Sequence, residues 1–141
     1  MENDFQLKKI DGNPDMNAYM EELKEDMKIS KANIMEKSML VGSLRTKWLN
    51  YYFKEKDNLR RIKAAKEKII RSKVDAKVSD SLLRMKSEDQ VAKNDPNVQK
   101  LNRMSETVRE NIEFLEKAMN ILNDFGFTVK NAIDVIKLER L

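Results

Sequence analysis

Apolar side chains recur at every seventh position through the middle of the chain. The series is interrupted once by a glutamate, and further apolar residues lie beside it at helical spacing. A seven-residue repeat keeps one face of a helix turned toward a partner helix. We therefore predict a long helix that begins near Ile29 and Ser30 and packs along this stripe. The stripe consists of Ile34, Val41, Trp48, Glu55, Ile62 and Ile69, flanked by Leu44, Tyr52, Leu59 and Ala65.

A second and more regular stripe occupies the C-terminal third of the chain. Four apolar residues are spaced by seven, a second row lies beside them, and two more residues widen the face. A face this wide favours a helical bundle or a ring of subunits over a two-stranded coil. The first row is Leu101, Val108, Leu115 and Leu122, the second is Met104, Asn111, Ala118 and Phe125, and the widening residues are Ile112 and Met119.

The second stripe is predicted to end at Gly126, because glycine readily takes the left-handed conformation that closes many helices. Phe127 would then complete the closing apolar contact. A last helix is expected from Thr128 to about Arg140, and the sequence helix, glycine, helix predicts a tight αα-hairpin. The apolar residues of this last helix are Val129, Ala132, Ile133 and Ile136.

The N-terminal part of the chain predicts an arm followed by a short helix. Residues 1–15 are polar and aperiodic, so we expect a flexible arm. Asn13 and Pro14 suit the cap and first position of a helix that runs to about Lys28. One face of this helix is apolar and the other is acidic, and the acidic face is either solvated or attracts a basic partner. The apolar residues are Met20, Leu23 and Met27, and the acidic ones are Glu21, Glu22, Glu25 and Asp26.

A firmer boundary lies at Asn94-Asp95-Pro96. Proline cannot continue a helix, and the residue before it is pushed toward an extended conformation. Asn94 or Asp95 is expected to cap the following helix, with Pro96 at its first position. Residues 78–93 either continue the central helix or form a new one capped by Ser79.

Composition agrees with a helical chain. Among 141 residues, 37% are charged and 6% are aromatic, and there are 3 Gly and 2 Pro. So few turn-forming residues argue against a sheet fold, and the abundant Lys, Glu, Met, Leu and Ala favour helix. We predict an all-α fold of long helices with a C-terminal helical hairpin or coiled-coil-like assembly region. Neighbouring subunits of a homo-oligomer are expected to complete the core.

The sequence lacks the residues on which most catalytic and metal sites depend. It contains no Cys and no His, which removes thiolates, the commonest metal ligand and the commonest general base. No phosphate-binding glycine loop occurs either. We therefore expect no enzymatic activity, no cofactor and no metal site. Because no apolar run approaches the roughly 20 residues of a membrane span and the N-terminus is unlike a signal peptide, a soluble intracellular protein is expected.

Positive charge is concentrated in the centre of the chain. The whole sequence has 28 Lys and Arg against 24 Asp and Glu, a net charge of +4. Residues 41–77 carry twelve basic and four acidic side chains, a net of +8, whereas residues 1–26 carry three and eight, a net of −5. Such an asymmetric distribution indicates a polyanionic partner.

Basic side chains surround most of the predicted central helix outside its apolar stripe. A structural helix usually interleaves Glu with Lys at i to i+4, but only Glu67 interrupts the cations between Asp57 and Asp75. Cations follow phosphates, and nearby aromatic rings can stack on unpaired bases, so this surface favours single-stranded nucleic acid. The candidate DNA-binding residues are Lys56, Arg60, Arg61, Lys63, Lys66, Lys68, Arg71 and Lys73.

Four aromatic residues lie at the head of this basic helix: Trp48, Tyr51, Tyr52 and Phe53. They either stack on bases or pack in the core. The position of Trp48 on the seven-residue stripe favours the core for that residue, and the sequence leaves the other three open.

Five short segments of this chain carry a family resemblance. They are MEELKEDMKI at 20–29, KWLN at 47–50, RIKAAK at 61–66 with the triplet Arg71-Ser72-Lys73 after it, NDPNVQKLN at 94–102, and FLEKAMNILNDFGFTVKNAIDVIKLER at 114–140. Together they span residues 20–140 in order and resemble the UvsY family of phage recombination mediators. KWLN and the Gly-Phe joint of the last segment are the most specific parts.

The resemblance implies a protein that binds single-stranded DNA, forms ring-like hexamers or heptamers, and loads a RecA-like recombinase onto strands coated by single-strand-binding protein. It also implies action in the cytoplasm of an infected host cell. Arg71 and Lys73 match the family's basic triplet. We expect the chain to divide into a flexible N-terminal arm (1–15), a helical DNA-binding region (16–93) and a C-terminal helical oligomerisation region (94–141). The expected oligomerisation residues are Leu101, Met104, Val108, Ile112, Leu115, Met119, Leu122, Phe125, Phe127, Val129, Ile133 and Ile136.

A structural or adaptor role remains as the alternative. The seven-residue stripes serve a coiled-coil adaptor equally well, and its basic face would then dock an acidic protein. A membrane-surface helix is disfavoured, because Glu55 interrupts the apolar stripe of the central helix.

Overall fold

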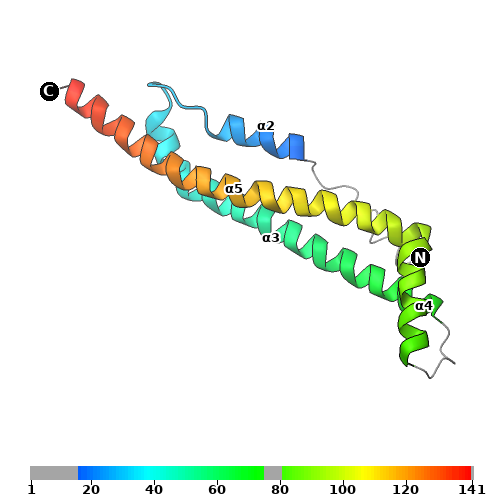
Figure 1. The fold of residues 1–141 in the computed structure, drawn as a ribbon. Helices are drawn as coiled ribbons and strands as arrows, with labels where there is room; N and C mark the ends of the chain where they lie inside the picture. The colour runs from blue at the N-terminus through cyan, green and yellow to red at the C-terminus, as the bar shows by residue number, and fades with distance from the viewer. Residues whose placement is uncertain (1–15, 75–80, 141) are drawn as a thin grey trace. The chain divides into compact units, whose positions relative to one another are not determined.

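The computed structural model describes residues 16–74 and 81–140. This part of the chain forms α2 (Met16–Asp26), α3 (Ile34–Lys73), α4 (Ser81–Asn94) and α5 (Pro96–Glu139), and it contains no strand (Figure 1). The predicted all-α fold is therefore confirmed for the described residues. No helix among them is both long and apolar enough to cross a membrane.

The chain divides into two compact units, and α3 and α5 each supply a segment to both. The described part of unit 1 comprises residues 55–74 and 81–110, and that of unit 2 comprises residues 16–54 and 111–140. Within each unit the two long helices run side by side in opposite directions (Figure 1). Each unit thus has an antiparallel helix pair, to which unit 1 adds α4 and unit 2 adds α2.

The apolar stripe predicted for the central helix faces the core. In unit 2, Ile34 and Trp48 are buried, and in unit 1 Ile62 and Ile69 are buried. Glu55, the polar member of the stripe, is also fully buried. The seven-residue spacing therefore identified the inward face of α3 correctly, including its one charged position.

The stripe of the C-terminal helix is confirmed as well. All four members of its first row are buried, and Val129, seven residues after Leu122, is 1% exposed. The core of unit 2 is formed by residues from three helices, because the apolar faces of α2, α3 and α5 converge there. It consists of Tyr19, Leu23, Ile34, Trp48, Leu115, Ala118, Leu122, Phe125 and Val129.

The predicted C-terminal hairpin is wrong. α5 continues from Pro96 to Glu139 without a break, and Gly126 does not take a positive φ. The apolar stripe passes through this point to Val129, so packing favours continuation of the helix over a turn. Phe127, expected to close the joint, is 67% exposed.

Gly126 instead allows a close approach between helices in unit 2. A Cβ at this position would lie 2.5 Å from Nη2 of Arg45 and 3.5 Å from Cγ1 of Val41. The absence of a side chain on α5 lets the guanidinium of α3 lie against the helix. A glycine inside a helical pattern is compatible with such packing as well as with a stop.

The start of α3 lies later than predicted, at Ile34 instead of near Ile29 and Ser30. The backbone N–H of Ser30 donates to Oδ1 of Asn33 at 2.6 Å, and the N–H of Asn33 donates to the carbonyl of Ser30 at 3.2 Å. These bonds form a turn. The helical ladder then begins where Lys37 N–H donates to the Asn33 carbonyl at 2.9 Å.

The predicted start of the last helix is confirmed, with Asp95 as its cap. Oδ1 of Asp95 accepts hydrogen bonds from the backbone N–H of Asn97 at 2.8 Å and of Val98 at 3.1 Å. Pro96 occupies the first helical position, where its missing N–H costs nothing. The predicted arm, the predicted helix start at Asn13 and Pro14, and the predicted cap Ser79 lie outside the described residues. Within the described residues, a separate helix, α4, begins at Ser81.

Candidate nucleic-acid interface

Unit 1 carries most of the excess positive charge. Its described residues include 14 Lys and Arg against 8 Asp and Glu, a net of +6, whereas those of unit 2 include 11 against 10, a net of +1. On the apolar stripe of α3, Ile62, Ala65 and Ile69 face the core. The predicted cations therefore lie around the outside of the helix. Seven of the eight candidates are exposed, and Lys66 is half-buried.

Two of these cations share one carboxylate. Nη2 of Arg60 lies 2.6 Å from Oδ1 of Asp57, and Nε of Arg61 lies 2.9 Å from Oδ2. The hydrogen bond from Arg60 and the charge of Arg61 hold the pKa of Asp57 below its usual value. Because one negative charge is shared by two guanidinium groups, the cluster remains cationic.

Lys73 is bound more closely than the sequence indicates. Its ammonium pairs with Oδ2 of Asp95, the same carboxylate that caps α5. The hydrogen bond from Lys73, with those from the backbone of Val98 and Asn97, lowers the pKa of Asp95. Lys73 therefore already has an anionic partner, and a phosphate at this position would compete with Asp95.

Arg71, the other matched member of the triplet, lines a groove of about 360 Å³ in unit 1. Glu67 of α3 and Glu88 and Asp89 of α4 line the same groove. Several carboxylates therefore surround Arg71. The local potential at Arg71 is less positive than its exposed position suggests.

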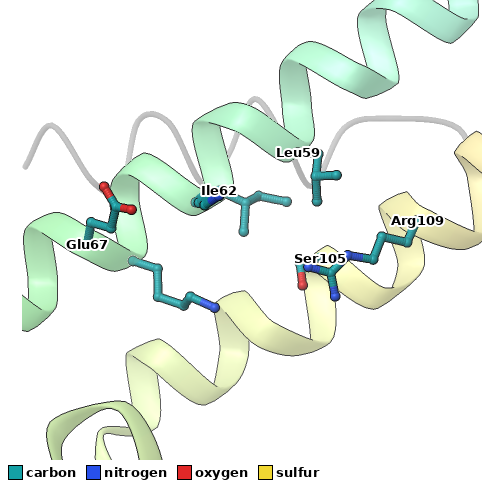
Figure 2. Close-up of a pocket in the computed structure, with 7 residues that line it drawn as sticks. Leu59, Ile62, Glu67, Ser105 and Arg109 are labelled. Carbon is teal, nitrogen blue, oxygen red and sulfur yellow. The ribbon is translucent and has the colours of Figure 1, made fainter. Parts of the chain in front are cut away.

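A second depression in unit 1 brings cations of two helices together. It has a volume of about 220 Å³. In Figure 2, Leu59 and Ile62 of α3 lie across from Ser105 and Arg109 of α5, whereas the carboxylate of Glu67 points away from α5. The lining residues are Leu59, Ile62, Lys63, Lys66 and Glu67 of α3, and Ser105 and Arg109 of α5.

Arg109 is the cation of this depression that the sequence did not single out. It lies in the C-terminal third, where the net charge over residues 94–141 is −1, with seven basic and eight acidic side chains. Its position follows directly after Val108 on the buried stripe. A residue next to the buried row lies at the edge of the helix pair. This spacing was the sequence feature that could have identified Arg109.

The aromatic head of the helix lies in unit 2 and belongs largely to the core. Trp48 is fully buried, its Nε1 donates to Oδ2 of Asp26 at 2.9 Å, and its ring lies 5.3 Å from that of Tyr51. The core interpretation of Trp48 is confirmed. Phe53 is 57% exposed, whereas Tyr52 is half-buried and donates to Oε1 of Glu116 at 3.3 Å.

The acidic face of α2 meets cations and hydroxyls of its own chain. Nζ of Lys47 lies 2.5 Å from Oδ2 of Asp26, and Oη of Tyr51 donates to Oε1 of Glu22 at 3.0 Å. Burial, and then the hydrogen bond to Glu22, raise the pKa of Tyr51. Glu21 and Glu25 pair with Lys24 and Lys28, so all four acidic residues have partners within unit 2. Neither sequence interpretation included this arrangement.

The expected oligomerisation residues lie mostly inside the chain. Of the twelve, seven are buried, four are half-buried, and Phe127 alone is exposed. Their role in self-association stays a prediction.

Within residues 16–74 and 81–140, no three His, Cys, Asp or Glu side chains gather closely enough to hold a metal ion.

Over its described residues the protein is all-helical, and unit 1 keeps a net charge of +6 despite its ion pairs. The model of one protein family, described as recombination, repair and ssDNA binding protein UvsY, matches residues 22–140. The chain belongs to this family. The family description names binding and repair, and it names no catalytic activity.

Solved structures of the recombination mediator protein UvsY of bacteriophage T4 share the fold. The lattice type II structure is 22% identical, covers 92% of this chain and 100% of its own, and superposes with a TM-score of 0.70. The lattice type IV structure is 22% identical, with coverages of 87% and 97% and a TM-score of 0.69. No curated protein sequence matches the chain significantly.

Proposed function

We propose that this protein is a recombination mediator that binds single-stranded DNA through the cations of α3 in unit 1. The observation that carries the proposal is the net charge of +6 on the described residues of unit 1, in a chain that belongs to the UvsY family. Exposed Lys and Arg side chains bind backbone phosphates without reading sequence, which suits a protein that acts on any strand.

The finer role follows from the family and from the charge pattern. The protein helps to load a RecA-like recombinase onto strands coated by single-strand-binding protein, in the cytoplasm of the infected host cell. Residues 16–93 provide DNA contacts and residues 94–141 provide self-association into a hexamer or heptamer. Several weakly binding basic helices then act on one strand, and multivalency multiplies their affinity.

A salt titration tests the DNA contact. The affinity for a fluorescent oligo(dT) is measured by anisotropy at several salt concentrations, for the natural protein and for Arg71→Ala/Lys73→Ala. Each lost phosphate contact is expected to flatten the log–log slope by about 0.7, because fewer counterions are released. Asp95 competes with phosphate for Lys73, and the carboxylates of the groove compete with it for Arg71. The change in slope per substituted residue should therefore be smaller than about 0.7.

The matched control is Lys117→Ala/Lys130→Ala, which removes two exposed cations of α5 in unit 2. This variant should keep the slope of the natural protein. Equal slopes for all three proteins would remove the triplet from the site. Absence of oligo(dT) binding at low salt would contradict the proposed function, and it would favour an adaptor whose basic face docks an acidic protein.

Mediator activity needs its own measurement. The rate at which a RecA-like recombinase displaces labelled single-strand-binding protein from a long strand is followed with and without this protein. We expect displacement to accelerate only at protein concentrations where oligo(dT) is bound. A mass measurement with and without oligo(dT) tests the hexamer or heptamer, and a monomer under both conditions would contradict assembly.

A further inference from the structure

We propose that the depression lined by Lys63, Lys66 and Arg109 binds one backbone phosphate of single-stranded DNA together with its sugar. The strand would then cross from α3 onto α5 within unit 1 instead of following α3 alone. This inference rests on the proposed function.

The charge of the depression favours an anion. Three cations and one carboxylate, Glu67, line it. Among the residues that the structure describes, neither Lys63 nor Arg109 forms an ion pair or a hydrogen bond through its side chain. Two cations without a partner at the mouth of one depression leave a positive potential that a phosphate would neutralise.

A hydrogen bond to α5 orients the ammonium group of Lys66 for phosphate binding. It is half-buried, and its Nζ donates to Oδ1 of Asn102 on α5 at 2.9 Å. An ammonium group has three N–H donors, so two remain for a ligand. Because Asn102 already restricts this long side chain, less conformational entropy is lost when a phosphate binds.

The hydroxyl of Ser105 is not available to donate a hydrogen bond to a phosphate. Its Oγ donates to the carbonyl of Asn102 at 3.0 Å, so its single proton is used within α5. The donors that remain for an anion are the two ammonium groups and the guanidinium of Arg109. A guanidinium offers paired N–H groups that match two phosphate oxygens, which gives Arg109 the most specific contact.

Size and the apolar wall restrict the ligand to part of a strand. Pockets that bury whole small molecules have volumes of roughly 300–1,000 Å³, whereas this one has about 220 Å³. Leu59 and Ile62 form an apolar wall beside the cations, against which a sugar ring can pack. A phosphate with its sugar fits these features, and a free nucleotide would leave its base outside.

The main test compares two arginines of the same helix. Arg109→Ala removes the proposed contact, and Arg103→Ala removes an exposed arginine of α5 in unit 1 that does not line the depression. For oligo(dT) we expect Arg109→Ala to raise the Kd about tenfold, since hydrogen bonds to charged groups are lost. The salt slope should fall by about 0.7 for each engaged subunit. Arg103→Ala should change the Kd less than about twofold.

Two further variants separate contact from folding. Arg109→Lys keeps the charge and should restore the salt slope while recovering only part of the affinity, because the paired donors are lost. Lys63→Ala should weaken binding in the same direction as Arg109→Ala. The far-UV circular dichroism spectrum and the thermal midpoint of each variant should match those of the natural protein, since the side chains of Lys63 and Arg109 are exposed.

The outcomes distinguish this inference from the proposed function. If the natural protein binds oligo(dT) but Arg109→Ala behaves like Arg103→Ala, the strand does not cross onto α5. The proposed binding by the cations of α3 would be unaffected. If inorganic phosphate or dTMP binds in an Arg109-dependent way while the oligo(dT) affinity is unchanged, the ligand is a free phosphate compound and the crossing is again wrong. If the natural protein binds no oligo(dT) at low salt, both proposals fail.

Discussion

Units 1 and 2 are built from the same two long helices but use charge in opposite ways. In unit 2 the cation Lys47 lies between an aromatic ring and acidic partners, 5.7 Å from the centroid of Trp48 and 2.5 Å from Asp26. In unit 1, Lys63 and Arg109 have no such partner in the described chain, and Arg60 and Arg61 share one carboxylate. The described part of unit 2 is close to neutral, and that of unit 1 keeps a net charge of +6.

The cores differ in the same sense. Unit 2 packs large rings, with the Tyr19 ring 6.1 Å from Trp48 and 5.4 Å from Tyr51. Unit 1 is held by smaller aliphatic residues along α3 and α5, which are Ile62, Ala65, Ile69, Val98, Leu101 and Val108. Large buried rings contribute much of the stability of a small core, so stability and binding are expected to depend on different units.

The largest expected effect is at Trp48 in unit 2. Trp48→Ala should lower the free energy of unfolding by about 3–5 kcal/mol, because it opens a cavity at the centre of the aromatic cluster. Urea unfolding followed by far-UV circular dichroism measures the loss. The neighbouring Leu49 is 40% exposed, and Leu49→Ala should cost less than about 1 kcal/mol. Equal losses for the two variants would contradict the central role of Trp48 in the core of unit 2.

A smaller effect is expected at Asp95 in unit 1, and it depends on pH. The pKa of Asp95 is lowered in the folded protein by Lys73 and by backbone N–H groups, so the carboxylate stabilises the fold above its unfolded pKa. That contribution is lost as the pH falls through the lower, folded pKa. Asp95→Asn keeps a capping side chain but removes the charge, so its thermal midpoint at pH 7 should lie a few degrees below that of the natural protein.

The gap between these two proteins should close as the pH falls below about 4, where the unfolded carboxyl becomes protonated. Asp95→Ala, which also loses the cap, should be the least stable of the three at every pH. A gap that stays constant between pH 7 and pH 3 would show that the charge of Asp95 does not stabilise the fold.

The smallest expected effect is a gain of DNA affinity. Asp57→Asn releases Arg60 and Arg61 from their shared carboxylate, which should tighten oligo(dT) binding about two- to threefold at low salt and steepen the salt dependence. The control is Glu113→Gln in unit 2, where the carboxylate lies 3.5 Å from Lys117. That variant should leave the affinity unchanged, and an equal gain in both would show that net charge alone controls binding.

The seven-residue spacing identified the inward faces of α3 and α5 and the burial of Trp48, because helical periodicity alone places such residues on one side of a cylinder. The start of α5 was likewise predicted, since a capping side chain and a following proline act locally. The choice between Asn94 and Asp95 as the cap was left open by the sequence, and the structure identifies Asp95. Gly126 was misread because a glycine in a helical pattern fits both a stop and a close approach. Only Arg45 on the neighbouring helix distinguishes them.

The sequence by itself determined the helical class, the two apolar stripes and the position of the excess charge, since each of these depends on spacing along the chain. The tertiary structure decided which charges remain available. Three arrangements join residues more than twenty positions apart: Lys73 pairs with Asp95, Lys47 pairs with Asp26, and Lys63 and Arg109 line one depression. Electrostatic attraction depends on distance in space, and that distance is set only when the helices pack.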